Sequence, residues 1–114
     1  MNRDKKWHKL EDYIALKLRE IDPFAKHTPG SGNGHKKGDI QNSVNLHIEC
    51  KERATDSVTI NNDVWNKLKA EIPLHVKKTP LLCLENKEGK RWAVLELSDF
   101  LNLYIELYKS KITD

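Results

Sequence analysis

The sequence predicts a single α/β domain over residues 1–114, in which a mixed central β-sheet is flanked by helices. In some segments apolar residues recur at three- and four-residue spacing, which is typical of helices, and in others they alternate with polar residues, which is typical of strands. These segments follow one another in the order helix, two or three strands, helix, two strands, helix. A chain of 114 residues is long enough to form one such domain with a modest core.

The first helix is expected over residues 4–21, where apolar residues recur at helical spacing. Its apolar stripe consists of Trp7, Leu10, Ile14, Leu18 and Ile21. Pro23 ends the pattern. Glu11 is expected at the edge of this stripe, where a carboxylate needs a partner or a catalytic task because its burial without either is costly. A boundary glutamate paired with a lysine is the alternative interpretation.

A half-buried strand is expected over residues 44–50, because every second residue there is apolar. The apolar set is Val44, Leu46, Ile48 and Cys50, and the opposite face carries Asn45, His47, Glu49 and Lys51. A short strand at Asp39–Gln41 and a turn at residues 42–43 precede it. The resulting hairpin would place the acidic residue of the first strand beside Glu49 and Lys51, so that two carboxylates and an ammonium group share one face.

Residues 26–38 form a glycine-rich loop between the first helix and these strands. A nucleotide-binding glycine loop follows a strand and opens a helix, and the order here is helix, loop, strand, which disfavours that interpretation. The loop suits contact with a DNA phosphate through its backbone N–H groups and through Ser31, Lys36 and Lys37. A flexible connector is the alternative.

The second half of the chain is expected to add one helix, two strands and a last helix. A possible short strand at residues 58–60 precedes a helix that Asn61 or Asn62 can cap and that Pro73 ends. The apolar stripe of this helix is Val64, Trp65, Leu68 and Ile72. The remaining elements are a central strand at residues 81–84, a hairpin loop at 86–90, a strand at 92–97 and a helix capped by Ser98 that runs to about residue 109.

The last helix is unusually apolar for a helix that buries one face. Apolar side chains cover roughly 200° of its circumference, against about 100° for a single buried stripe. They are Phe100, Leu101, Leu103, Tyr104, Ile105, Leu107 and Tyr108. Helix 99–109 is therefore expected to pack partly on the sheet and partly on a second chain in a homodimer, with a single thick core as the alternative.

Composition limits the classes of function. The net charge of +3 is mild, and the longest apolar run, Leu81–Leu84, is far too short to span a membrane. The N-terminal charges are not followed by an apolar stretch, so no secretory signal is expected and the protein is placed in the cytoplasm. Cys50 and Cys83 are interpreted as buried free thiols, and not as a disulfide or a zinc pair.

The residues of the hairpin suit metal-dependent phosphodiester hydrolysis. Carboxylates from Asp39 and Glu49 can hold Mg²⁺ or Mn²⁺ and leave positions open for water and phosphate. Lys51 can orient or deprotonate the attacking water. Cys50 would contribute its backbone carbonyl to the ion while its side chain faces the core, and Glu11 could complete the site through a water or a second metal.

This pattern resembles a known group of enzymes. Asp39 followed by Glu49-Cys50-Lys51 is similar to the signature of the PD-(D/E)XK nuclease superfamily, with Gly38 where that signature has proline. The superfamily core, a helix, a β-hairpin, a helix and a strand, would cover residues 4–85 and implies a restriction-endonuclease-like fold. Within it the chain resembles the small Holliday-junction resolvases of archaea and phages, which the matching positions of Glu11, Ser31-Gly32, Asp39, Glu49 and Lys51 indicate.

The resemblance implies a homodimer that cuts two opposed strands of a four-way DNA junction with one metal site in each chain. It implies catalytic roles for Glu11, Ser31, Asp39, Glu49 and Lys51. Phosphate contacts are expected from Lys5, Lys6, Lys9, His35, Lys36, Lys37 and Arg53. A phage-encoded protein of this kind would act in the host cytoplasm.

Alternatives to a junction resolvase are a nicking or other endonuclease of the same fold and a non-catalytic DNA-binding module. The small chain has no insert for sequence-specific restriction, and a binding-only module has no reason to keep two carboxylates facing a polyanion. His47 is expected to be a polar strand residue near the edge of the cleft. The spacing of His8, His27 and His75 predicts no zinc site.

Overall fold

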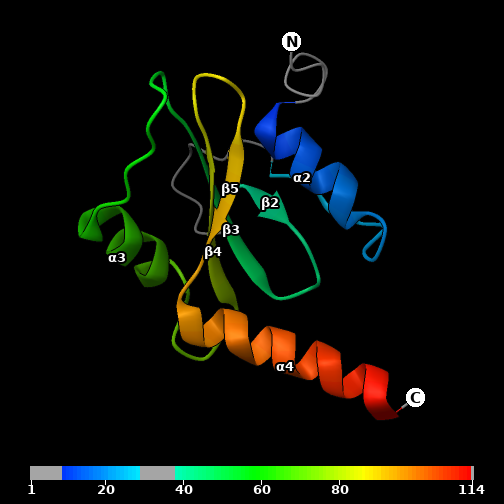
Figure 1. The fold of residues 1–114 in the computed structure, drawn as a ribbon. Helices are drawn as coiled ribbons and strands as arrows, with labels where there is room; N and C mark the ends of the chain where they lie inside the picture. Colours follow the sequence, from blue (N-terminus) through cyan, green and yellow to red (C-terminus); the bar gives the residue numbers. More distant parts are fainter. Residues whose placement is uncertain (1–8, 29–37, 114) are drawn as a thin grey trace.

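The structure, a computed structural model, describes residues 9–28 and 38–113 and is a mixed α/β fold (Figure 1). Its described elements are α2 (Leu10–Leu18), β1 (Lys26–His27), β2 (Ile40–Gln41), β3 (Leu46–Glu52), α3 (Asn62–Ala70), β4 (Thr79–Glu85), β5 (Arg91–Val94) and α4 (Leu97–Thr113). The expected α/β class with a mixed sheet is therefore confirmed, whereas β1 lies in the segment 26–38 that was predicted to be a loop.

The main sheet has three strands in the order β3–β4–β5. β3 and β4 are parallel and joined through α3, with Leu46 opposite Thr79 and Glu52 opposite Glu85. β5 runs antiparallel to β4. The central place of β4 explains its nearly continuous apolar sequence, because both of its faces are covered. β1 and β2 form a separate antiparallel ribbon beside the free edge of β3.

Helices α2 and α3 lie on opposite sides of the sheet and divide the core in two (Figure 1). The core under α2 contains Leu10, Ala15, Ile40, Ile48 and Cys83, and the core under α3 contains Leu68, Leu82 and Leu84. Because side chains alternate along a strand, β3 and β4 supply residues to both layers.

The first helix is shorter than predicted. Lys9 precedes α2 with an extended backbone, φ −60° and ψ 159°, so α2 begins at Leu10, and residues 4–8 of the predicted helix lie outside the described residues. It ends at Leu18, and Ile21 is 71% exposed, so the predicted stripe is wrong at that residue. Trp7 lies outside the described residues.

The hairpin before β3 also differs from the prediction. Asn45 has a φ of +64°, a left-handed conformation that interrupts a strand, and β3 begins at Leu46 instead of residue 44. The side chain of Asn42 organises the turn: its amide nitrogen donates to the carbonyls of Ile40 and Leu46, and its Oδ1 accepts from the N–H groups of Val44 and Leu46. The turn therefore spans residues 42–45 and not 42–43 alone.

The second half of the chain differs from the prediction in smaller ways. Residues 58–60 form no strand, and Val58 packs against the core under α3. Asn61 caps α3 by accepting the N–H of Val64 at 2.9 Å, as one of the two expected caps. β5 ends at Val94 and α4 already begins at Leu97, so Ser98 lies inside the helix and not at its cap.

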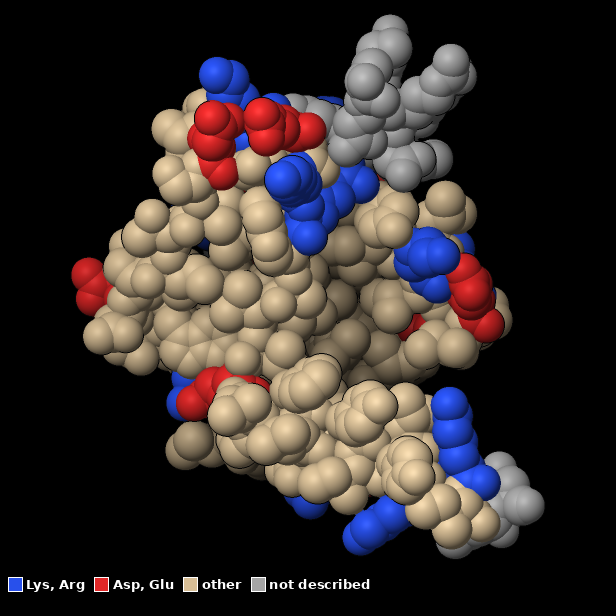
Figure 2. Space-filling model, in the orientation of Figure 1, with Lys and Arg blue, Asp and Glu red and all other residues tan. Residues whose placement is uncertain are grey.

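Helix α4 projects along one end of the molecule with its apolar face uncovered by the described chain (Figures 1 and 2). Phe100, Leu103, Tyr104, Leu107 and Tyr108 are 46–59% exposed. The expectation that part of this helix packs on the sheet, and the alternative of a single thick core, are therefore wrong. None of the helices within residues 9–28 and 38–113 is long and apolar enough to cross a membrane.

Asp22 ties the end of α2 to the hairpin turn. Its Oδ2 accepts the N–H of Ser43 at 2.6 Å, and its Oδ1 accepts the N–H of Phe24 at 3.1 Å. The hydrogen bond from Ser43 lowers the pKa of Asp22 below its usual range, in spite of the opposing effect of burial. Asp22 thus helps to position the ribbon that precedes β3.

We expect Asp22→Asn to lower the unfolding temperature at pH 7, because the amide cannot accept two strong hydrogen bonds as a carboxylate does. A lowered folded-state pKa means that the stabilisation is present above the unfolded pKa of about 3.9 and is lost as the pH falls through the folded-state value. The difference between wild type and variant in thermal unfolding should therefore shrink below about pH 4. Asp56→Asn, at an exposed aspartate, is the control, and equal unfolding temperatures for Asp22→Asn and wild type at pH 7 would contradict the assignment.

Candidate functional site

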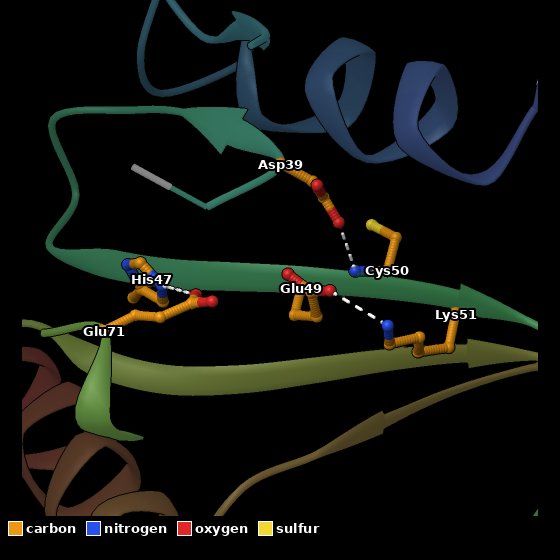
Figure 3. Close-up of polar contacts among 6 residues, drawn as sticks. All are labelled: Asp39, His47, Glu49, Cys50, Lys51 and Glu71. Atoms are coloured by element: carbon orange, nitrogen blue, oxygen red, sulfur yellow. Dashed lines mark hydrogen bonds and ion pairs between the residues drawn. The ribbon is translucent and has the colours of Figure 1, made fainter. Parts of the chain in front are cut away.

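Asp39 is bound to the free edge of β3 by both its backbone and its side chain. Its N–H donates to the carbonyl of Ile48 at 2.7 Å, and its Oδ2 accepts the N–H of Cys50 at 2.7 Å. Figure 3 shows the carboxylate of Asp39 pointing at the segment of β3 that carries Glu49 and Cys50. Residues 11 positions apart in sequence are thus held in contact, as predicted. The predicted strand pairing is wrong, because β2 pairs with β1 and β3 belongs to another sheet.

Gly38 makes this approach possible. Its φ is +76°, and a Cβ atom at this position would lie 2.9 Å from the carbonyl oxygen of Ile48 and 3.2 Å from its nitrogen. Glycine accepts such a φ without strain, whereas the proline ring fixes φ near −65°. A glycine at this position therefore has a structural reason in this chain.

Glu49 and Lys51 lie on the α3 side of β3 and form an ion pair. Lys51 Nζ lies 3.2 Å from Glu49 Oε2 (Figure 3). Both residues border a small pocket under α3 with Lys67 and Glu71. Burial raises the pKa of Glu49, the negative charge of Asp39 raises it further, and Lys51 opposes both effects. Glu49 and Asp39 are therefore electrostatically coupled, although they reach this region from different elements.

Glu11 reaches the same region from α2, on the other side of β3. One donor atom from each of Glu11, Asp39 and Cys50 lies within 4.8 Å of the other two. Burial raises the pKa of Glu11, a positive charge on His27 would lower it, and Asp39 raises it. The partner of Glu11 is His27, whose Nε2 lies 2.9 Å from Glu11 Oε1, and not the lysine of the alternative interpretation.

The two cysteines face each other across β3 and β4. Cys50 lies directly opposite Cys83 in the parallel register. Both are free thiols, as predicted, but only Cys83 is buried, and Cys50 is partly exposed. A hydrogen bond with the Cys83 thiol raises the pKa of Cys50, and burial and the charges of Asp39 and Glu11 act in the same direction. The thiol of Cys50 is therefore held in its neutral form when no cation is bound.

His47 is not at the edge of a cleft, and that prediction is wrong. Its side chain is buried, with the residue only 1% exposed, and its Nε2 lies 3.0 Å from Glu71 Oε1 (Figure 3). Glu71 closes the C-terminal end of α3 and covers this part of the strand, which removes His47 from solvent. The pair is structural in character, because a buried imidazole needs a hydrogen-bond partner.

The predicted site residues are only partly brought together. Five of them lie together around β3, namely Glu11, Asp39, Glu49, Cys50 and Lys51. Lys9 is exposed beside the start of α2, and Arg53 follows the end of β3, where its N–H donates to the carbonyl of Glu85. The remaining predicted residues lie outside the described ranges, namely Lys5, Lys6, Ser31, His35, Lys36 and Lys37.

The prediction that the carboxylates of Asp39 and Glu49 share one face with Lys51 was incorrect in one respect. Asp39 approaches β3 through its open edge, so its carboxylate lies near Glu49 on one side and near Glu11 and Cys50 on the other. The only metal-sized cluster of acidic, cysteine or histidine donors within the described ranges is the one formed by Glu11, Asp39 and Cys50. It includes the Cys50 side chain, which the sequence placed in the core.

Sequence reasoning missed three residues near this centre: His27, Lys67 and Glu71. His27 was considered only for zinc spacing, and its contact with Glu11 joins residues 16 positions apart. Lys67 and Glu71 lie on α3, on the side that covers Glu49 and Lys51. No local pattern could have identified these residues, because each depends on which helix covers which face of β3.

Comparisons with protein-family models, with curated proteins and with solved structures find no match to this chain. Its function is therefore argued from the arrangement of these side chains.

We expect Gly38→Ala to destabilise the fold more than Gly89→Ala does. Both glycines have a positive φ, +76° and +88°, so each alanine would meet a left-handed penalty of about 1–2 kcal/mol. At Gly38 the new Cβ would in addition collide with the backbone of Ile48. Chemical denaturation of the two variants measures the difference, and an equal loss of unfolding free energy would show that Gly38 is not needed for the close approach of Asp39 to β3.

Proposed function

We propose that this chain is a metal-dependent DNA endonuclease that hydrolyses phosphodiester bonds and selects branched DNA, a four-way junction in particular. The observation that carries the proposal is the 2.7 Å hydrogen bond from Cys50 N–H to Asp39 Oδ2. It holds the aspartate against the strand that carries Glu49 and Lys51, which is the juxtaposition that the Asp39…Glu49-x-Lys51 pattern needs.

The topology supports the restriction-endonuclease-like core of this proposal. A helix precedes the ribbon that delivers Asp39, β3 carries the Glu-x-Lys segment, and a helical crossover leads to a parallel strand. Glu11 is delivered by the first described helix to within 4.8 Å of Asp39. These are the positions that the resemblance to small junction resolvases assigns.

The donor set fits a divalent cation such as Mg²⁺ or Mn²⁺. Glu49 is partly buried, and the negative charge of Asp39 adds to burial in raising its pKa. A divalent cation between them would offset this repulsion. Asp39 keeps one carboxylate oxygen outside its bond to Cys50, and this oxygen, a Glu49 oxygen and the Cys50 carbonyl would hold the ion.

The ion would supply a water of lowered pKa and would offset charge on the phosphate. Lys51 holds a proton at Nζ, 3.2 Å from Glu49, and is placed to orient the attacking water or to take its proton. Glu11 contributes a further negative group from α2 that can position a water. Arg53 and Lys9 carry the positive charge with which the described chain would contact phosphates.

A homodimer formed through α4 completes the proposal. The helix has 17 residues and a length of about 25 Å, and its apolar face has no cover in the described chain. Its polar residues gather on the opposite side of the helix, among them Asn102, Glu106 and Lys109. A second copy of the same face is the simplest cover, and a two-fold dimer suits the two-fold symmetry of a four-way junction.

We expect Asp39→Asn and Glu49→Gln each to reduce cleavage in Mg²⁺ by about 100-fold or more, because each removes a charged ligand of the ion. Binding of a four-way junction should persist, since neither residue is assigned to DNA affinity. The assay compares a four-way junction, a fork, a nicked duplex and a linear duplex, with Glu88→Gln as an exposed control. Cleavage at the wild-type rate by either variant would refute the assignment, and junction binding by a wild type that cuts none of these substrates would indicate a non-catalytic module.

We expect the protein to be a dimer at micromolar concentration and Tyr104→Glu to weaken the dimer at least about tenfold, because it places a charge in the centre of the apolar face. Asn102→Glu adds the same charge on the polar face and should leave the dimer intact. Sedimentation velocity measures both. A wild-type monomer at micromolar concentration would contradict a dimer, and equal effects of the two substitutions would exclude this face.

A further inference from the structure

The side of β3 that faces α2 carries one metal donor that the proposed nuclease site does not use, the thiol of Cys50, beside two carboxylates that the two sites share. Cys50 presents its side chain on this side, whereas Glu49 lies on the α3 side (Figure 3). One carboxylate oxygen from Glu11, one from Asp39 and the sulfur of Cys50 lie within 4.8 Å of one another. This set differs from the oxygen ligands that Mg²⁺ takes, because one of its three donors is a thiol.

Each of the two carboxylates in this cluster is already held by another group. Cys50 N–H donates to Asp39 Oδ2 at 2.7 Å, and His27 Nε2 lies 2.9 Å from Glu11 Oε1. A carboxylate has two oxygens, so both residues can keep these contacts and still offer a ligand atom. Outer hydrogen bonds of this kind are what orients the ligands in protein metal sites.

A buried hydroxyl beside Asp39 gives an independent indication of a ligand. Thr28 is 3% exposed, and its Oγ1 has no hydrogen-bond partner among the described residues. Its N–H donates to the carbonyl of Asp39 at 2.9 Å, which continues the antiparallel pairing of β1 with β2. Residues opposite each other in such a ribbon present their side chains on the same face, so the Thr28 hydroxyl shares a face with the Asp39 carboxylate. A water bound to an ion there would give this hydroxyl the partner that it lacks.

We propose that Glu11, Asp39 and Cys50 form a binding site for a thiophilic divalent cation of the zinc class, with water as the fourth ligand. Sulfur donors favour zinc-class ions over Mg²⁺, and three protein ligands with one water make an open tetrahedral site. Zinc bonds of about 2.0–2.3 Å put neighbouring donors about 3.5 Å apart, so the 4.8 Å cluster must contract by roughly 1 Å. The long side chain of Glu11, on the partly exposed face of α2, can supply this movement. On binding, the Cys50 thiol proton passes to solvent, a sulfur–metal bond replaces the S–H bond, and no electrons are transferred.

This site departs from the expectation that neither cysteine binds a metal. Cys83 faces Cys50 across the two strands but is not a member of the cluster, so it is assigned no ligand role. The site does not depend on nuclease activity, and it is tested without DNA.

The test is a titration of the reduced protein with Co²⁺, which takes the same ligands as zinc and shows a thiolate-to-cobalt absorption band. Wild type should develop this band with an end point at one equivalent, and Zn²⁺ should abolish it while an excess of Mg²⁺ does not. Cys50→Ser should lose the band, and Glu11→Gln should weaken Co²⁺ binding at least about tenfold. Cys83→Ala is the matched control and should keep the band.

Circular dichroism establishes that each variant is folded, and Glu11→Gln, on the surface of α2, keeps the test open if Cys50→Ser does not fold. The absence of a thiolate band in folded wild type would overturn the proposal. A band that survives Cys50→Ser, or one that folded Cys83→Ala loses, would overturn it as well. Loss of cleavage in Mg²⁺ bears on the nuclease proposal alone, because this titration measures the sulfur–metal bond directly.

Discussion

The structure depends on the way Asp39 closes the free edge of β3. β3 is an edge strand of the three-stranded sheet, so its outward N–H and carbonyl groups need partners. Asp39 provides two of them, since its N–H donates to Ile48 and its carboxylate accepts from Cys50. A stabilising contact at the edge of the sheet thereby places an acid between the two layers of the molecule. Gly38 is required for this contact because no side chain fits against Ile48 at its position.

The consequence of this closure is a concentration of negative charge around one strand. Glu11 lies on α2, Asp39 directly precedes β2 and Glu49 lies on β3, and the charge of Asp39 raises the pKa of both glutamates. His27 and Lys51 reduce the repulsion from either side. Repulsion among these carboxylates opposes folding unless a bound ligand offsets it. Acids with perturbed pKa values of this kind cluster at functional sites. A divalent cation is the ligand that we propose, because its charge would offset the repulsion among these carboxylates.

Much of this centre could be predicted from sequence, because local strand and helix periodicity indicates on which face each of its side chains lies. The alternation around Ile48 separates Glu49 and Lys51 from Cys50, and the edge position of Glu11 on its helix follows from the spacing of its apolar neighbours. The N-cap of α3 could also be predicted locally, and Asn61 was one of the two residues expected there. These predictions needed only the period of a helix or a strand and the chemistry of a cap.

The remaining features depend on contacts that no local pattern encodes. The burial of His47 is set by Glu71 at the end of α3, and the partner of Glu11 is set by the position of β1. β3 is shorter than the alternation of its sequence predicts, because Asn45 has a left-handed backbone. The side chain of Asn42 holds this turn by accepting the N–H of Leu46. The wide apolar face of α4 was visible in the sequence, but its exposure was not, since only tertiary structure shows which surfaces the chain itself covers.

The most direct measurement of the central claim is the anomalous scattering of Mn²⁺ in crystals of the protein. Mn²⁺ prefers oxygen ligands, and we expect one peak between Asp39 and Glu49, within bonding distance of the Cys50 carbonyl. The peak should be absent from crystals of Asp39→Asn. Crystals in which Mn²⁺ binds elsewhere, or in which the carboxylates of Asp39 and Glu49 contact no common ion, would contradict the claim that the closed edge of β3 forms a catalytic metal centre.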